Sequence, residues 1–325
     1  MNSMKAYDSG GKLLFGLDGM SLKMNNFYED SFSSKLMDAF ESGGYDAMAT
    51  LMFGKITQVK VASASDVWGG NSGSVGEPGA GNDTLTGEGG GKLAGGKGDD
   101  TYVVDLIKKG GKPALADSVA ENAGEGNDTL KLNAPDLQLT SPFTLVVPKN
   151  FEAVDLSGTG SNKLNLTGNA LDNLLTGNSA DNVITGLAGN DTLIGGQGND
   201  TLVGGLGNDS LTGGQGADRF VFDSALNDKT NLDVITDFAS GVDKLVLSDK
   251  IFTKLKGDTN LGDNFVPGQT LLALDANDYL YFDIQTSTLY YDADASGSKG
   301  AIAICKLVGV TTLSASDMVI ASGMK

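Results

Sequence analysis

Six consecutive nonapeptides between residues 168 and 221 constrain the fold of this chain more than any other feature. They read GNALDNLLT, GNSADNVIT, GLAGNDTLI, GGQGNDTLV, GGLGNDSLT and GGQGADRFV, without an insertion. The eighth position is apolar in every unit: Leu175, Ile184, Leu193, Leu202, Leu211 and Phe220. One apolar side chain per unit, after a run rich in Gly, Asn and Asp, predicts a tight turn followed by a short strand with that side chain pointing inward.

Two units predict one coil of the backbone, so strands two units apart stack in parallel at about 4.8 Å. This stacking places Asp191 over Asp209 and Asp200 over Asp218. Carboxylates this close repel each other unless a cation lies between them, and with turn carbonyl oxygens they form a ligand set that suits Ca²⁺ before Mg²⁺. We predict several calcium ions, held by residues of the last four units: Gly186, Gly189, Asp191, Gly195, Gly196, Gly198, Asp200, Gly204, Gly205, Gly207, Asp209, Gly213, Gly214, Gly216 and Asp218.

The first two units differ at the sixth position, where they carry Asn173 and Asn182. Asp172 and Asp181 lie one place earlier. We expect these units to continue the coil with weak calcium sites or none. For the units that carry Asp, the alternative is an uncharged β-solenoid held by ladders of Asn side chains.

A second, imperfect block of repeats covers residues 76–105. GAGNDTLTG supplies Asp83 and GGKGDDTYVVD supplies Asp100, about one coil apart, so one more calcium ion is predicted there. The unit between them, GEGGGKLA, is one residue short and has no Asp, so a pair of Gly-rich turns without metal is the alternative. Further on, GEGNDTLKL is a lone repeat, and ligation by its Asp128 depends on what lies above it.

The chain divides into five predicted regions: a small α+β region (1–67), the short repeat block (76–105), a β-rich connection (106–167), the main block (168–221) and a β cap (222–325). In the first region, helical spacing of apolar residues predicts helices over 30–41 and 45–53. The fold class is therefore all-β, a parallel β-roll or β-solenoid with a β cap and a small α+β region before it.

The cap region begins where the period breaks, and Phe220 and Phe222 are expected to close the open end of the coil. Its acids Asp233, Asp237 and Asp243 either extend the calcium sites or are solvated turn acids. DADASGSKG resembles the start of an EF-hand loop, but Ala303 stands where the bidentate Glu belongs, so we interpret this segment as a turn.

Composition excludes several classes of function. With 41 acidic and 23 basic residues the net charge is −18, which predicts neither nucleic acid nor an anionic membrane surface as a partner. The absence of His excludes HExxH zinc peptidases and hydrolases with a Ser-His-Asp or Cys-His centre. The single Cys305, in an apolar run, is expected to be a buried strand residue, and neither a membrane span nor a cleavable signal peptide is expected.

From the block at 76 to the end, the chain resembles the RTX, or hemolysin-type calcium-binding repeat, family. The resemblance is most specific over 186–221, where the units match G-G-x-G-x-D-x-U-x at every key position apart from Leu187. It implies export by a type I secretion machinery, with an uncleaved signal in roughly the last 60 residues, ending at DMVIA. It also implies that the chain folds outside the cell, where millimolar calcium fills sites with a Kd of about 10⁻⁴–10⁻³ M.

The sequence thus predicts a secreted, extracellular, non-enzymatic calcium-binding protein, either a small structural or adhesive exoprotein or the C-terminal part of one. Cell-surface or extracellular polysaccharide is a candidate partner. The alternative is a polysaccharide-acting enzyme or its accessory module, because an acid-only glycosidase or lyase needs no His. Its candidate residues, which lie in no recognisable motif, are Asp275, Asp278, Tyr279 and Tyr281. A third reading, a pore-forming toxin, lacks the long apolar helical region that it requires.

Overall fold

A computed structural model describes residues 3–7, 13–18, 21–23, 58–62, 67–70, 75–77, 81–87, 90–258, 261–268, 278–295 and 300–322. Before residue 81 it describes backbone strands only. The chain forms two compact units. The first consists of residues 1–137 and 148–154, and the second of residues 138–147 and 155–325.

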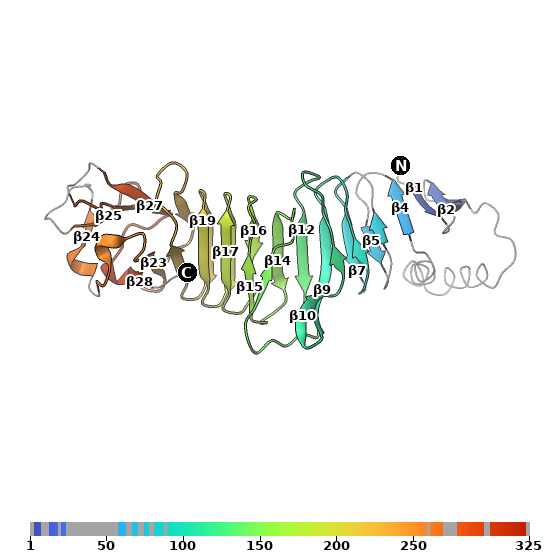
Figure 1. Ribbon diagram of the computed structural model, residues 1–325, viewed down its shortest axis with the longest axis horizontal. Helices are drawn as coiled ribbons and strands as arrows, with labels where there is room; N and C mark the ends of the chain where they lie inside the picture. Colours follow the sequence, from blue (N-terminus) through green and yellow to red (C-terminus); the bar gives the residue numbers. More distant parts are fainter. Residues whose placement is uncertain are drawn as a thin grey trace. The chain divides into compact units, whose positions relative to one another are not determined.

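The second unit contains two sheets built from alternate turns of a coil. In one sheet the order is β13-β15-β17-β19-β21-β23-β28, and every pair is parallel. These strands are β13 (Phe143–Val146), β15 (Leu164–Thr167), β17 (Val183–Ala188), β19 (Thr201–Leu206), β21 (Arg219–Phe222), β23 (Lys244–Ser248) and β28 (Met318–Ala321). Figure 1 shows β15, β17 and β19 as neighbouring arrows.

The facing sheet begins with the parallel strands β16 (Leu174–Thr176), β18 (Thr192–Gln197), β20 (Ser210–Gln215) and β22 (Asp233–Ile235). Register pairs Leu193 with Leu211, and Ile184 with Leu202 in the first sheet, which is the offset of two nonapeptides. All six eighth-position side chains are fully buried. The predicted parallel coil is therefore confirmed, and its strands run on into the glycines that begin the next unit.

Parallel stacking continues past residue 221, where the nine-residue period ends. β22 pairs in parallel with β27 (Ile302–Leu307), and β23 pairs in parallel with β28. An antiparallel meander then adds β26 (Thr288–Tyr291) and β25 (Leu280–Asp283), with β24 (Phe265–Gly268) at the edge. The described residues of this region also include three short 3-10 helices: η1 (Thr253–Leu255), η2 (Leu261–Asp263) and η3 (Ala315–Asp317). Phe220 and Phe222 are buried as predicted, and the Phe220 ring lies 6.0 Å from that of Phe238.

Buried Asp317 ties the last strand to the rest of the cap. Its carboxylate accepts hydrogen bonds from Ser240 Oγ (2.6 Å) and Gly241 N (2.8 Å) and from Ser314 N (2.9 Å). Burial acts to raise the pKa of Asp317, but these hydrogen bonds and the nearby Lys244 hold it below its ordinary value. The segment that contains the predicted secretion signal is thus a structural part of the folded cap.

The first unit repeats the coil on a smaller scale. Its two sheets have the orders β5-β7-β9-β12, with β10 beside β9, and β11-β8-β6-β4-β1-β2-β3. The strands are β1 (Ser3–Tyr7), β2 (Leu13–Asp18), β3 (Ser21–Lys23), β4 (Gln58–Ala62), β5 (Val67–Gly70), β6 (Val75–Glu77), β7 (Thr84–Gly87), β8 (Lys92–Leu93), β9 (Thr101–Lys109), β10 (Lys112–Leu115), β11 (Ser118–Val119) and β12 (Thr129–Asn133). Leu85, Tyr102 and Leu130 stack in register and are fully buried. β14 (Ala153–Gly158) contains the last of the two points at which the chain passes from the first unit to the second.

Part of the prediction falls outside the described residues. The helices expected over 30–41 and 45–53 lie there, whereas the described parts of 1–67 are strands. Where the structure describes the chain, no helix is long and apolar enough to cross a membrane. Cys305 is fully buried in β27, as expected.

Candidate calcium-binding turns

The aspartates at the sixth position of units three to six stack in two columns, one at each turn edge of the coil. In the first column Asp209 Oδ1 accepts a hydrogen bond of 2.8 Å from Asp191 N, and in the second Asp218 Oδ1 accepts one of 2.8 Å from Asp200 N. Each carboxylate therefore lies directly beside the turn one coil earlier. The structure brings together the pairs that the repeat predicts.

Two cap residues extend these columns. Asp233 Oδ1 accepts from Asp209 N at 3.1 Å, and Asp243 Oδ1 accepts from Asp218 N at 2.9 Å. Both side chains are buried, so they are not solvated turn acids. Asp237 has another role, since its carboxylate accepts hydrogen bonds from the backbone N–H groups of Gly213 and Gly214 at 2.9 and 2.8 Å.

The second carboxylate oxygen distinguishes these aspartates from ordinary turn residues. The Oδ2 atoms of Asp191, Asp200, Asp209 and Asp218 are buried and have no hydrogen-bond partner among the described residues. The four side chains are at most 1% exposed. A buried carboxylate oxygen without a partner is costly, so this arrangement favours a bound cation.

Glycines at the first position leave room for such a cation. A Cβ added to Gly186 would overlap Asp191 Oδ2 and would lie 2.6 Å from Gly204 O, one coil further on. The equivalent Cβ at Gly195 would overlap Asp200 Oδ2 and lie 2.5 Å from Gly213 O. Carboxylate and carbonyl oxygens therefore converge where no side chain intrudes, and an all-oxygen set of this kind fits Ca²⁺.

Glycines at the second and fourth positions shape the turn itself. Gly189, Gly198, Gly207 and Gly216 at the fourth position have φ between 118° and 143°, and Gly196, Gly205 and Gly214 at the second have φ between 98° and 114°. Leu187 departs from the pattern at the second position, yet the turn holds it at φ 84°, in the left-handed region that non-Gly residues rarely adopt. The stacked turns thus impose their backbone even on a leucine.

In the first two nonapeptides, hydrogen bonds between Asn side chains and the backbone close the turns. Asn173 Oδ1 accepts from Asn169 N at 2.8 Å, and Asn182 Oδ1 accepts from Asn178 N at 2.9 Å. Asn182 Nδ2 also donates to Asn178 Oδ1 at 3.0 Å. An Asn at the second position therefore satisfies the Asn at the sixth, in place of a cation.

The first compact unit of the chain, outside the six nonapeptides, contains a similar column of aspartates in a less regular sequence. Asp100 Oδ1 accepts from Asp83 N at 2.8 Å, as their spacing predicts. Asp128 is not isolated, because its Oδ1 accepts from Asp100 N at 2.9 Å and its own N donates to Glu152 Oε2 at 2.8 Å. The lone repeat at Asp128 is thus the next coil of the short block.

Asp117 fills the position that the short unit GEGGGKLA leaves without an Asp. Its Oδ1 accepts from Gly91 N at 2.8 Å, its side chain is 3% exposed, and a Cβ on Gly87 would overlap its carboxylate. Sequence reasoning missed Asp117 because it lies 26 residues beyond Gly91. One feature common to these acids could have identified them, namely their position at the start of a strand. Asp117, Asp128 and Asp243 each lie immediately before a strand, and Asp233 is the first residue of one.

Without a cation, burial raises the pKa values of these acids. Burial and the neighbouring Asp209 raise the pKa of Asp191 to about 6, and burial and Asp218 raise that of Asp200 to about 7. Burial and Asp209 raise the pKa of Asp233 to about 8. A proton can therefore replace part of the missing cation charge at these positions.

We expect acid to stabilise the calcium-free coil. The pKa values in the folded state lie above the ordinary value near 3.8, so the added stability is present below pH 4 and is lost as the pH rises through about 6 to 8. In calcium-free buffer, the strand signal in far-UV circular dichroism should therefore be larger at pH 5 than at pH 8. At saturating calcium the urea midpoint should instead be higher at pH 8, because protons compete with the cation at pH 5. An equal strand signal at the two pH values in calcium-free buffer would contradict this expectation.

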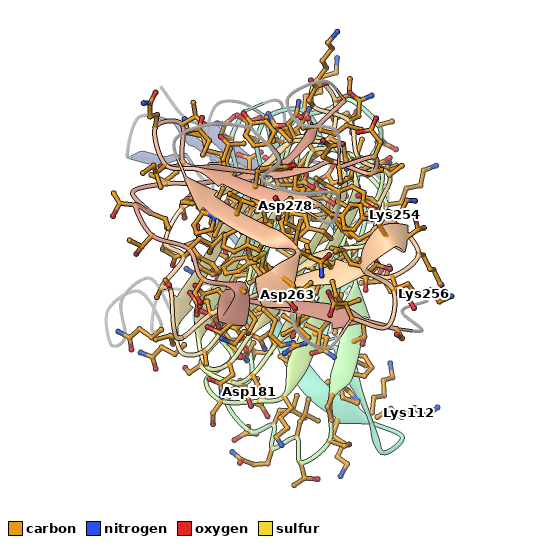
Figure 2. All side chains as sticks on the ribbon, turned by 90° about the vertical axis from the view of Figure 1, so that its left-hand side faces the viewer. Lys112, Asp181, Lys254, Lys256, Asp263 and Asp278 are labelled. Carbon is orange, nitrogen blue, oxygen red and sulfur yellow. The ribbon has the colours of Figure 1, made fainter. Side chains whose placement is uncertain are left out.

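Of the residues considered for an enzyme of polysaccharides, those that the structure describes are buried or half-buried. Asp278 is 5% exposed and Tyr281 1%, so both point into the cap, where Figure 2 labels Asp278. Tyr279 is half-buried, and Asp275 lies outside the described residues.

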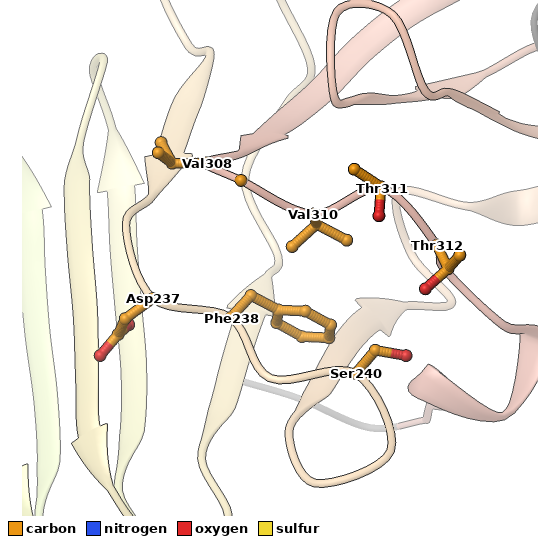
Figure 3. A pocket seen from close by; sticks show the side chains of 8 residues that line it. Asp237, Phe238, Ser240, Val308, Val310, Thr311 and Thr312 are labelled. Atoms are coloured by element: carbon orange, nitrogen blue, oxygen red, sulfur yellow. The ribbon is translucent and has the colours of Figure 1, made fainter.

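Near the coil, an open hollow of about 380 Å³ is lined by Phe238, Val308 and Val310 among others (Figure 3). Its one acid, Asp237, is already bound to two backbone N–H groups.

Comparison with known protein families identifies the repeats. The family model of the RTX calcium-binding nonapeptide repeat matches in four copies, over residues 167–202 and 194–224. The chain therefore carries an RTX repeat block, in agreement with the resemblance seen in its sequence. No curated protein matches the chain significantly.

Proposed function

We propose that this protein is a secreted, non-catalytic calcium-binding protein whose coils fold when calcium enters the turns outside the cell. One observation carries the proposal: buried, unpartnered Oδ2 atoms of the described turns converge with carbonyl oxygens around glycines. Asp191, Asp200, Asp209 and Asp218 would hold the ions together with those carbonyl oxygens. Calcium supplies the positive charge that lets these acids lie ionised inside the coil.

The RTX block supports export through a type I secretion machinery. In this proposal the chain crosses the envelope unfolded at low cytosolic calcium. At about a hundred times its Kd, each filled site would then stabilise the folded state by about 2.7 kcal/mol. Calcium would thereby restrict folding to the outside of the cell.

Deletion of residues 266–325 tests the export part of the proposal. In a host with a functional type I exporter, the full chain should appear in the medium and the truncated chain should stay inside the cell. The matched control is the full-length chain with Asp209→Asn, which weakens calcium binding but keeps the proposed signal, and it should still be exported. Export of the truncated chain at the normal level would refute the signal.

A further inference from the structure

Three carboxylates of the first unit meet outside the block that matches the repeat family. One oxygen each from Asp100, Glu121 and Asp128 lies within 4.8 Å of the other two. Asp100 precedes β9 and Asp128 precedes β12, which stack in parallel. Glu121 belongs to neither turn, because it follows β11 in the connecting segment.

Each carboxylate is oriented by a backbone N–H through one of its oxygens. Asp83 N donates to Asp100 Oδ1 at 2.8 Å, Asp100 N to Asp128 Oδ1 at 2.9 Å, and Gly95 N to Glu121 Oε1 at 3.2 Å. The other oxygen of each is buried and has no hydrogen-bond partner in the part of the chain that the structure describes. Asp100 and Asp128 are each 1% exposed, so water cannot readily solvate their free oxygens.

Hydrogen bonds to the backbone and to the carboxylate of Glu121 fix the position of its side chain. Asn150 Nδ2 donates to the Glu121 carbonyl at 2.8 Å, which fixes the backbone. The Gly95 N–H is shared between the Glu121 carboxylate and the Tyr102 hydroxyl. Tyr102 is fully buried, and its ring packs edge-on against Phe151 at 5.1 Å. The glutamate therefore points into the carboxylate cluster as part of a packed structure.

We propose that Asp100, Glu121 and Asp128 form a divalent-cation site, most suited to Ca²⁺, that includes a ligand from outside the nonapeptide pattern. Oxygens within 4.8 Å of one another fit around one ion at the usual Ca–O distance of about 2.3–2.6 Å. Three carboxylates give this site more negative charge than a turn pair of the main block. Since affinity for Ca²⁺ rises with the number of charged ligands, this site should fill at lower calcium than the repeats. The inference does not depend on whether the main block binds calcium.

Glu121→Gln in the full chain tests the site, because it removes the charge of one ligand and keeps its shape. The matched control is Glu125→Gln, four residues on, whose side chain bonds Asn122 Nδ2 at 2.8 Å and is outside the cluster. Isothermal titration with Ca²⁺ should show one ion fewer for Glu121→Gln, with the tightest phase lost, and the wild-type number for Glu125→Gln. An unchanged tight phase in Glu121→Gln would overturn the site. Absence of calcium binding by the wild type would overturn this inference and the proposed function together.

A second measurement uses the neighbouring tyrosine and does not require a variant of the ligands. Residues 168–221 contain neither Tyr nor Trp, whereas the Tyr102 hydroxyl shares a donor with Glu121. Tb³⁺ bound at the proposed site should therefore emit on excitation of tyrosine, and Tyr102→Phe, which keeps the buried ring, should reduce that emission at least twofold. Emission that is the same in Tyr102→Phe would count against the site even if Glu121→Gln failed to fold.

Discussion

Removal of calcium with EDTA is expected to abolish most of the parallel strand signal of the second unit. Without the cation, carboxylates stacked one coil apart repel each other inside the coil, and their Oδ2 atoms, which have no hydrogen-bond partner among the described residues, lose the positive charge beside them. Several sites, each contributing about 2.7 kcal/mol at a hundred times its Kd, together reach the stability of about 5–15 kcal/mol that is typical of a folded domain. The measurement is far-UV circular dichroism during an EDTA titration near pH 7.5.

Two controls make the EDTA experiment specific. Excess Ca²⁺ should restore the spectrum, whereas Mg²⁺ at the same concentration should not, because Mg²⁺ requires a tighter octahedral shell. A chelator already saturated with calcium should have no effect. A spectrum that is unchanged by EDTA would show that the coil folds without metal and would contradict the proposed function.

Asp209→Asn is expected to have the largest effect of any single substitution in the main block. Asp209 lies in the middle of its column, with its Oδ1 on Asp191 N and its own N on Asp233 Oδ1, so the substitution changes two neighbouring turns at once. The new amide would lack the partner that Asn173 and Asn182 find, because the second position of this unit is Gly205. The calcium concentration at the midpoint of folding should rise at least about tenfold, which corresponds to about 1.4 kcal/mol.

Asp228→Asn provides the control for this substitution, since it removes the same charge from an exposed side chain of the cap. Its calcium midpoint should stay within about twofold of the wild type. If both variants shifted equally, the effect would come from net charge, and the column would have no special role.

The main block was predictable because its period sets the register directly. With nine residues per repeat and two repeats per coil, Leu193 must stack on Leu211 and Asp191 on Asp209, whatever the rest of the chain does. The same rule failed at the edges of the block, where insertions change the spacing. Asp233 and Asp243 follow their partners by 24 and 25 residues, so periodicity alone could not assign them to the columns.

Site residues that come from distant segments of the chain could not be predicted from the sequence either. Asp117 and Glu121 approach turns that precede them by 26 residues, and their positions depend on the hairpin of β9 and β10 that brings β11 back beside β8. No local sequence pattern predicts which strand the chain pairs with after such a hairpin. The free oxygens of the described carboxylates identified these residues, because that signal depends on three-dimensional burial and not on spacing.

The hydrogen bonds between successive coils run in both directions. Asp191 N donates forward to Asp209 Oδ1, whereas Ser210 N donates back to Asp191 O and Asn208 N donates back to Asn190 Oδ1. Each turn therefore depends on both of its neighbours, and the cap supplies the last forward acceptors through Asp233 and Asp243. Since one turn alone would leave these donors and acceptors without partners, the coil should order over several turns together rather than turn by turn.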